Sequence, residues 1–238
     1  MMEQKLKKDI IEWDVHNWSQ ALDFWTAHVD LNTGKMECLE LGGRQGGLSL
    51  WLASKGHKVV CSDLDSPEEY ASKLHSKYPF ADLIKYEAID ATRIPYENQF
   101  DLVVFKSILG GISRGGNHPR KQESVDQIYK ALKPSGKLLF AETLEASSLH
   151  KYHRKKFIKW ADDWNYLKYS DLAHLFHEFE NVKFQTVGFF GAFGRSEGQR
   201  NFLGKIDSLL KPFLPKQKRY IVFVIAEKGN FPERGDIK

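Results

Sequence analysis

The fold is decided by residues 36–47, which read MECLELGGRQGG. The first half, residues 36–41, is mostly apolar and has the length of a buried β-strand. The second half is a glycine-rich turn, and residues 48–54 after it are long enough for a short helix. Glycine lets a backbone turn tightly and approach a ligand, and the start of a helix presents free N–H groups. This stretch therefore predicts a strand, a ligand-facing turn and a helix.

Strands and helices alternate beyond this turn. We predict strands at 58–62, 83–89, 100–105 and 137–141, and helices at 48–54, from Ser66 onward and at 123–132. Ser66 stands where a capping hydroxyl is expected, and Pro67 occupies the first helical position. Such alternation is typical of right-handed βαβ units and a parallel sheet. Two later strands are predicted at 182–190 and 220–226, with a helix at 196–210 between them.

Acidic residues stand near the ends of three successive strands. Glu40 precedes the first glycine by two residues, Asp63 ends the second strand, and Asp90 follows the third. The carboxyl ends of parallel strands form the ligand-binding edge of such a sheet, where a carboxylate can accept both ribose hydroxyls of a nucleoside. The three acids around a glycine turn therefore predict a nucleoside site.

Five motifs over residues 36–140 resemble, in order and spacing, those of class I S-adenosylmethionine-dependent methyltransferases of the small-molecule or glycan type. They are ELGGRQG at 40–46, VVCSDL at 59–64, IDATRIP at 89–95, FDLVV at 100–104 and LKPSGKL at 132–138. The resemblance implies a seven-stranded, mostly parallel, doubly wound α/β sheet with an antiparallel last strand, a position that residues 220–226 fit. It also implies S-adenosyl-L-methionine as the cofactor.

The resemblance assigns roles to the residues that match these motifs. Glu40, Gly42 and Gly46 are expected around the amino-acid end of the cofactor, Asp63 at its ribose, and Asp90 and Ala91 at its adenine. The complete set of expected cofactor-binding residues is Glu40, Gly42, Gly43, Arg44, Gly46, Asp63, Leu64, Asp90, Ala91 and Phe105.

Arg44 departs from the family pattern, because it stands where the middle glycine of the loop is expected. Its side chain has three interpretations: it crowds the cofactor, it pairs with the cofactor's carboxylate, or it points to solvent. The same departure counts against a nicotinamide dinucleotide site, since a pyrophosphate needs close backbone approach at that third position.

Composition sets outer limits on the class of protein. The 238 residues include 42% hydrophobic and 28% charged residues, which excludes a disordered chain, and no apolar run reaches the length of a membrane span. Two cysteines and no signal-peptide core predict a cytoplasmic protein. The net charge of +4 falls short of a dedicated nucleic-acid binder but allows a local basic patch.

The whole chain, 1–238, is expected to form one domain. Residues 1–35 are predicted to be a helical lid, with an amphipathic helix from Glu12 to Asp30 whose Trp18 and Trp25 pack inward. Residues 36–143 are the cofactor-binding core. A helical insertion with the sixth strand, residues 144–210, lies on the substrate side, and residues 211–238 supply the final strand and tail.

Transfer to a hydroxyl needs a base, and histidine is the side chain best tuned for that role. His118 and His150 are the candidate bases, because they follow the fourth and fifth strands. His150 and His153, like His174 and His177, are three residues apart, but no cysteine accompanies either pair, so no metal site is predicted.

The segment 151–160 mixes five basic residues with three aromatics. This composition suits a nucleic-acid surface or a pocket for an anionic small molecule. The plainest interpretation is a helix with a basic solvated face and with Tyr152, Phe157 and Trp160 turned inward.

The sequence favours a methyltransferase that acts on an oxygen of a small-molecule or glycan-like, anionic acceptor. The Asn/Asp-Pro-Pro-aromatic signature of enzymes that methylate amino groups of adenine or glutamine is absent after Phe105, where Lys106 and Ser107 follow. The alternatives are an RNA methyltransferase that uses residues 151–160, and a catalytically inactive methyltransferase-like scaffold suggested by Arg44. Oligomeric state is left open.

Overall fold

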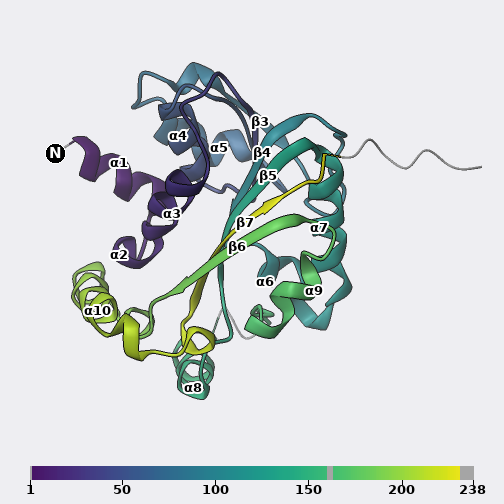
Figure 1. Ribbon diagram of the computed structural model, residues 1–238. Coiled ribbons are helices and arrows are strands. Elements are labelled where there is room, and N and C mark those ends of the chain that lie inside the picture. The colour runs from purple at the N-terminus through teal and green to yellow at the C-terminus, as the bar shows by residue number, and fades with distance from the viewer. Residues whose placement is uncertain (1, 160–162, 231–238) are drawn as a thin grey trace, which may run out of the picture.

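The computed structural model describes residues 2–159 and 163–230. These residues form a seven-stranded sheet in the order β3-β2-β1-β4-β5-β7-β6 (Figure 1). Strands β1 to β5 pair in parallel, and β7 runs antiparallel to both of its neighbours. The predicted mostly parallel sheet with an antiparallel last strand is therefore confirmed. The strands are β1 Glu37–Leu41, β2 Lys58–Asp63, β3 Ile84–Ala88, β4 Phe100–Lys106, β5 Leu132–Thr143, β6 Glu180–Val187 and β7 Ile221–Glu227.

Helices cover both faces of the sheet, because the central strands are buried on both sides. One apolar cluster joins the sheet to α1, α3, α4 and α5, and contains Trp25 and Trp51. The other joins it to α6, α7 and α9, and contains the stacked rings of Phe105 and Phe140. The helices are α1 Met2–Ile11, α2 Val15–Trp18, α3 Gln20–His28, α4 Gly47–Ser54, α5 Pro67–His75, α6 Leu109–Ile112, α7 Pro119–Ala131, α8 Ser148–Phe157, α9 Leu172–Leu175 and α10 Glu197–Leu210.

The N-terminal region is helical, but the single helix predicted from Glu12 to Asp30 is wrong. The chain forms α1, α2 and α3, with Glu12 and Asp14 in the left-handed region at φ 70° and 45°. The backbone N–H groups of Asp14 and Val15 donate to the carboxylate of Glu197 instead of continuing a helix. The break is thus held by a residue far along the chain. Trp18 and Trp25 are buried as predicted.

Other strand boundaries differ from the predicted ones, because tertiary contacts at these positions are not visible in the local sequence pattern. Strand β5 begins at Leu132 instead of Lys137, and Ser135 at φ 61° lies inside it, where the register with β4 shifts. Strand β6 ends at Val187 because Gly188 turns at φ +75° against the ring of Tyr220. Ser66 precedes α5 as expected, but its hydroxyl donates to Asp65 and caps nothing.

Before β6, the described residues of the insertion predicted to be helical form α8, α9 and the 3-10 helix Tyr169–Asp171. The expected orientation of α8 is wrong: Tyr152 is 61% exposed and Phe157 50% exposed, whereas His150 and Arg154 face inward. Trp160 lies outside the described residues. The inward face of α8 is therefore polar, and this polarity shapes the candidate site. Within the described ranges, no helix combines the length and apolar character needed to cross a bilayer.

Candidate functional site

The glycine turn is clamped between β1 and α4 by its own backbone. Gly43 N–H donates to the carbonyl of Ser62 on β2 at 2.8 Å, and Gly46 N–H donates to the carbonyl of Gly43 at 2.7 Å. Gly42 adopts φ +59°, and a Cβ there would lie 2.4 Å from the Ile108 side chain. Only glycine satisfies both conditions, so the turn is kept close to the sheet edge.

Two carboxylates predicted from sequence hold this turn in place. Glu40 accepts from the N–H groups of Leu48 and Ser49, at 3.1 and 2.7 Å, in the first turn of α4. Asp63 accepts from the N–H groups of Arg44 and Leu64, at 2.8 and 2.7 Å. Burial raises the pKa of Glu40 to about 7, against the opposing effect of these hydrogen bonds. Each Asp63 oxygen accepts one hydrogen bond from these groups, and with respect to the described residues it keeps a lone pair for a hydroxyl donor.

The remaining expected cofactor residues lie in three settings. Asp90, at the end of β3, accepts from the N–H and hydroxyl of Thr92, which lowers its pKa, and lies 3.6 Å from the Arg120 guanidinium. Ala91 beside it is half-buried, and Leu64 is 69% exposed. Phe105 packs in the core, so the next residue of β4, Lys106, lines the cavity instead.

A cavity of about 810 Å³ opens beside the glycine turn. Its lining combines Glu40, Gly42, Gly43 and Arg44 with the ends of β4 and β5, the Glu12–Trp13 segment, and side chains of α8 and α10. Asp63 and Asp90 do not line it. Arg44 is exposed and also lines the cavity, so its three interpretations, crowding of the cofactor, pairing with the cofactor's carboxylate and exposure to solvent, stay predictions.

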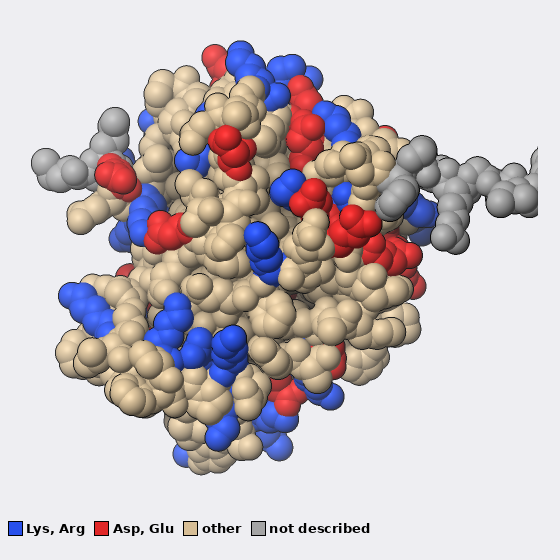
Figure 2. Space-filling view, viewed as in Figure 1, with Lys and Arg blue, Asp and Glu red and all other residues tan. Residues whose placement is uncertain are grey.

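The far wall of the cavity is basic and aromatic. The Arg154 guanidinium lies 3.9 Å from the Tyr166 ring centroid and donates to the carbonyls of Leu144 and Glu145, at 2.9 and 3.1 Å. Arg114 lies over the Trp164 ring at 5.2 Å. The cationic lining residues are Arg44, Lys106, Arg114, Arg154 and Arg200, and the acidic ones are Glu12 and Glu40. Lys and Arg side chains also gather on the lower left of the surface in Figure 2, near α8 and α10.

The two candidate bases, His150 and His118, differ in their position relative to the cavity. His150 is buried in the lining: its Nε2–H donates to the Phe189 carbonyl, so Nδ1 accepts from the Ser147 hydroxyl. Burial lowers the pKa of His150 to about 4. His118 lies outside the lining, and its Nδ1 is hydrogen-bonded to the Asn165 amide.

His153, which the sequence did not predict as a base, also lines the cavity. Its ring contacts Phe157 and Phe193, and burial lowers its pKa. Among the described residues, no hydrogen bond engages its ring nitrogens. The sequence does show that His153 lies one helical turn from the candidate base His150. It does not show which face of that helix turns toward the cavity.

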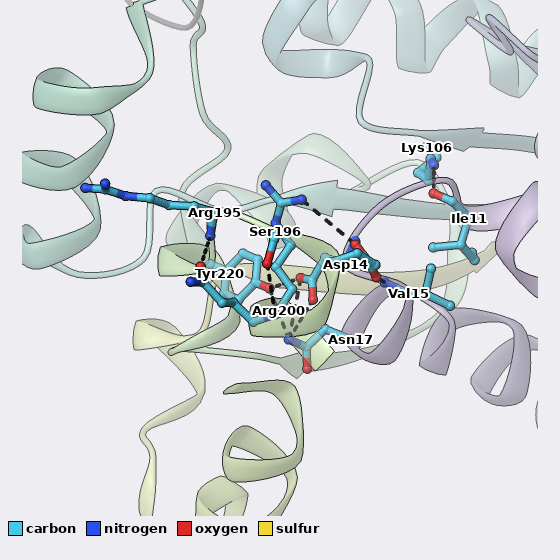
Figure 3. Close-up of polar contacts among 11 residues, drawn as sticks. Ile11, Asp14, Val15, Asn17, Lys106, Arg195, Ser196, Arg200 and Tyr220 are labelled. Atoms are coloured by element: carbon cyan, nitrogen blue, oxygen red, sulfur yellow. Dashed lines mark hydrogen bonds and ion pairs between the residues drawn. The ribbon is translucent and has the colours of Figure 1, made fainter. Parts of the chain in front are cut away.

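The N-terminal segment is fastened over the cavity by two sets of contacts (Figure 3). Lys106 donates to the Ile11 carbonyl at 2.6 Å, and burial lowers its pKa. Asp14 accepts from Asn17, at 3.2 Å, and from the hydroxyl of Tyr220. Burial raises the pKa of Asp14 to about 7.

We predict that this buried carboxyl makes stability fall with rising pH. The pKa of Asp14 is higher in the folded than in the unfolded chain, where 3.8 is ordinary, so the folded state binds the proton more tightly. The resulting stabilisation is complete below about pH 4 and is lost as pH rises through about 7. Asp14→Asn keeps an acceptor for Tyr220 and should reduce the loss of unfolding free energy between pH 5 and pH 8 by about 2 kcal/mol.

Urea unfolding at both pH values measures this difference. Asp23→Asn, an exposed acid on α3, is the matched control and should keep the wild-type slope. Since Glu40 and Glu142 also have pKa values raised to about 7, some pH dependence remains in every variant. An Asp14→Asn slope equal to wild type would assign the effect to those two groups alone.

The described residues contain no group of three or more His, Cys, Asp and Glu side chains placed to hold a metal ion. His174 and His177 stack with ring centroids 5.7 Å apart.

Comparison with known proteins places residues 39–140 in a family model described as a methyltransferase domain. No curated protein sequence matches the chain. Phosphoethanolamine N-methyltransferase 2 from Haemonchus contortus, solved with phosphomonomethylethanolamine and S-adenosylhomocysteine, is similar at TM-score 0.60 and 17% identity. The match covers 89% of this chain and 53% of that one, so this chain spans about half its length.

Two further solved structures share the fold. An S-adenosylmethionine-dependent methyltransferase from Methanosarcina mazei matches at TM-score 0.59 and 15% identity, over 87% of this chain and 97% of that one. The [4+2]-cyclase SpnF matches at TM-score 0.60 and 16% identity, over 90% and 83%. At these identities the likeness establishes the fold, and the chemistry must be argued from the site.

Proposed function

We propose that this chain, whose residues 39–140 match a methyltransferase-domain family model, is a class I S-adenosylmethionine-dependent methyltransferase that methylates an oxygen of an anionic small molecule held in the 810 Å³ cavity. The observation that carries the proposal is the composition of this one cavity. A glycine turn borders it on one side, and a wall of arginines and aromatics borders it on the other. The first side suits a nucleoside cofactor, and the second suits an anionic acceptor.

The carboxylates around the glycine turn fit S-adenosylmethionine. Asp63, with a free lone pair on each oxygen, would accept the ribose hydroxyls, and Glu40 would face the amino-acid end. Asp90 and Ala91 would border the adenine, beyond the part of the turn that lines the cavity. When bound, the cofactor supplies an electrophilic methyl group, and the protein's own task is to align the acceptor and exclude water.

The basic wall supports a charged acceptor of limited size. Arg154 is held rigidly by two carbonyls and the Tyr166 ring, so its remaining N–H donors need little reorganisation to meet an anion. Arg114 and Arg200 are placed by contacts with Trp164 and Trp13. The acceptor of the Haemonchus contortus enzyme, phosphomonomethylethanolamine, is also a small phosphorylated compound. This agreement supports the acceptor class and leaves its identity to experiment.

A hydroxyl acceptor needs a proton acceptor, and we place that role on His153. Its ring lines the cavity, and its lowered pKa favours the neutral imidazole, which is the form that can accept a proton. Both nitrogens of His150 are engaged, so His150 positions the inner face of α8. His118, outside the lining, would need a rearrangement to reach the acceptor.

We expect His153→Gln to lower kcat about 100-fold while S-adenosylhomocysteine binding stays within about twofold of wild type, because only proton transfer is removed. His118→Gln is the matched control and should keep wild-type kcat. Calorimetry measures binding, and transfer of a tritiated methyl group measures turnover. If His118→Gln lost turnover and His153→Gln did not, His118 would be the proton acceptor instead of His153.

The acceptor class is tested with the methyl-labelled cofactor and four separate pools: sugar phosphates, hydroxy acids, phosphoethanolamine and total RNA. Labelled product in the first two, with the methyl on oxygen by fragment mass spectrometry, is the expected result. Methylation of phosphoethanolamine alone would move the acceptor atom to nitrogen. Methylation of RNA alone would replace the proposal by the RNA alternative, and cofactor binding without transfer to any pool would favour the inactive scaffold.

A further inference from the structure

Helix α10 carries an apolar stripe that faces away from the protein. Phe202, Leu209 and Phe213 are 64%, 76% and 81% exposed, and Ile206 lies between them, half-buried. Phe213 belongs to the short 3-10 helix Lys211–Phe213 that directly continues α10. Spacings of four, three and four residues place these side chains on one face of a helix. Large apolar side chains with this exposure, aligned over three turns, are typical of an interaction surface.

The opposite face of α10 is anchored, so the outward orientation of the stripe is set by the fold. The carboxylate of Asp207 accepts from the N–H groups of Phe190 and Gly191, at 2.7 and 2.9 Å. Gly204 packs so closely on His16 that a Cβ would lie 2.7 Å from its ring. Rotating α10 to bury the stripe would break these contacts.

The charges around the stripe are almost all positive. Residues 198–218 contain Arg200, Lys205, Lys211, Lys216 and Lys218, and their single acid, Asp207, is buried. The basic helix α8 lies beside the start of α10, where the Arg195 guanidinium is 5.4 Å from the Phe157 ring centroid. Leu149 and Tyr152 on α8 are also exposed, at 53% and 61%. Figure 1 shows both helices at the same end of the molecule.

We propose that the stripe of α10, with its surrounding lysines, docks on the surface of an anionic phospholipid bilayer. Apolar side chains would enter the boundary between headgroups and acyl chains, and lysines would meet the phosphates. A second copy of the chain suits the stripe less well, because face-to-face pairing would set the same lysines against each other. Arg200, in the first turn of α10, also lines the cavity, so docking would hold the cavity near the membrane surface.

Cosedimentation of the full chain with vesicles tests this docking. We expect binding to vesicles of phosphatidylcholine with one quarter phosphatidylglycerol, weakened by added salt, and no binding to phosphatidylcholine alone. The variant Phe202→Ser/Leu209→Ser/Phe213→Ser should bind at least about tenfold more weakly, because the inserted apolar area is removed. The variant Lys205→Glu/Lys216→Glu/Lys218→Glu should lose binding to a similar extent.

The control is Tyr70→Ser, which removes a 57% exposed aromatic from α5 and should bind like wild type. Circular dichroism and S-adenosylhomocysteine affinity confirm that each variant is folded, and neither readout depends on the membrane. Wild type that ignores anionic vesicles would overturn the proposal. The stripe would then be a self-association surface if sedimentation velocity showed a dimer for wild type and a monomer for the stripe variant.

Discussion

Asp63→Ala is expected to weaken S-adenosylhomocysteine binding at least about 100-fold, the largest effect of any single substitution at this site. The carboxylate has two tasks. It accepts from the N–H groups of Arg44 and Leu64, which keeps the glycine turn against β2, and in the proposed cofactor complex it would also accept from the ribose hydroxyls. Alanine removes both the positioning of the turn and the ligand contact at once. Isothermal titration calorimetry measures the change directly.

The matched control is Asp65→Ala, two residues further along the same loop. Asp65 is exposed, and within the described part of the chain it accepts a hydrogen bond only from the Ser66 hydroxyl, so its removal should leave affinity within about twofold of wild type. Circular dichroism establishes that both variants are folded. If the Asp63→Ala protein were folded and bound S-adenosylhomocysteine with wild-type affinity, the proposed cofactor site at this edge of the sheet would be wrong.

Arg154→Met is expected to lower the free energy of unfolding by about 2–4 kcal/mol. The guanidinium is buried and donates to two carbonyls, those of Leu144 and Glu145, directly after β5, while its plane covers Tyr166. Methionine keeps much of the apolar volume but leaves both carbonyls without these donors and removes the cation–π contact. The loss should loosen the segment that joins β5 to α8, and with it the acceptor wall.

Lys155→Met, the next residue on the exposed face of α8, is the control and should change the free energy of unfolding by less than about 0.5 kcal/mol. Urea unfolding with an unchanged m-value separates a stability change from a change in the denatured state. Equal stability of the two variants would show that Arg154 is dispensable to the fold. In that case its role would be confined to acceptor binding.

The proposals are independent in what they require. The methyl-transfer proposal depends on Asp63, the glycine turn and the basic wall, whereas vesicle docking depends on the outer face of α10. A stripe variant that keeps cofactor affinity but loses vesicle binding would separate them. The opposite result, binding to vesicles by a chain that does not bind cofactor, would leave the docking surface intact and remove the proposed enzyme.

The sequence alone determined the sheet and the place of the glycine turn, because both depend on local information. Apolar runs, glycines and the acids at strand ends lie within a few residues of one another, and their order along the chain specifies parallel βαβ units. Glu40 and Asp63 could therefore be placed at the turn before any tertiary contact was known.

Only the tertiary structure determined where the N-terminal helices break and which face of α8 turns inward. The break at Asp14 depends on Glu197 and Tyr220, more than 180 residues away, and no local pattern specifies such a contact. Helix α8 shows the same limit: apolar periodicity predicts that Tyr152 turns inward, yet the carbonyls after β5 need a donor, and Arg154 takes the inner face. Although Leu144 and Glu145 are only ten and nine residues from Arg154, the side of α8 that meets them depends on how the helix packs beside the end of β5, and the pattern of residues in α8 does not specify that packing.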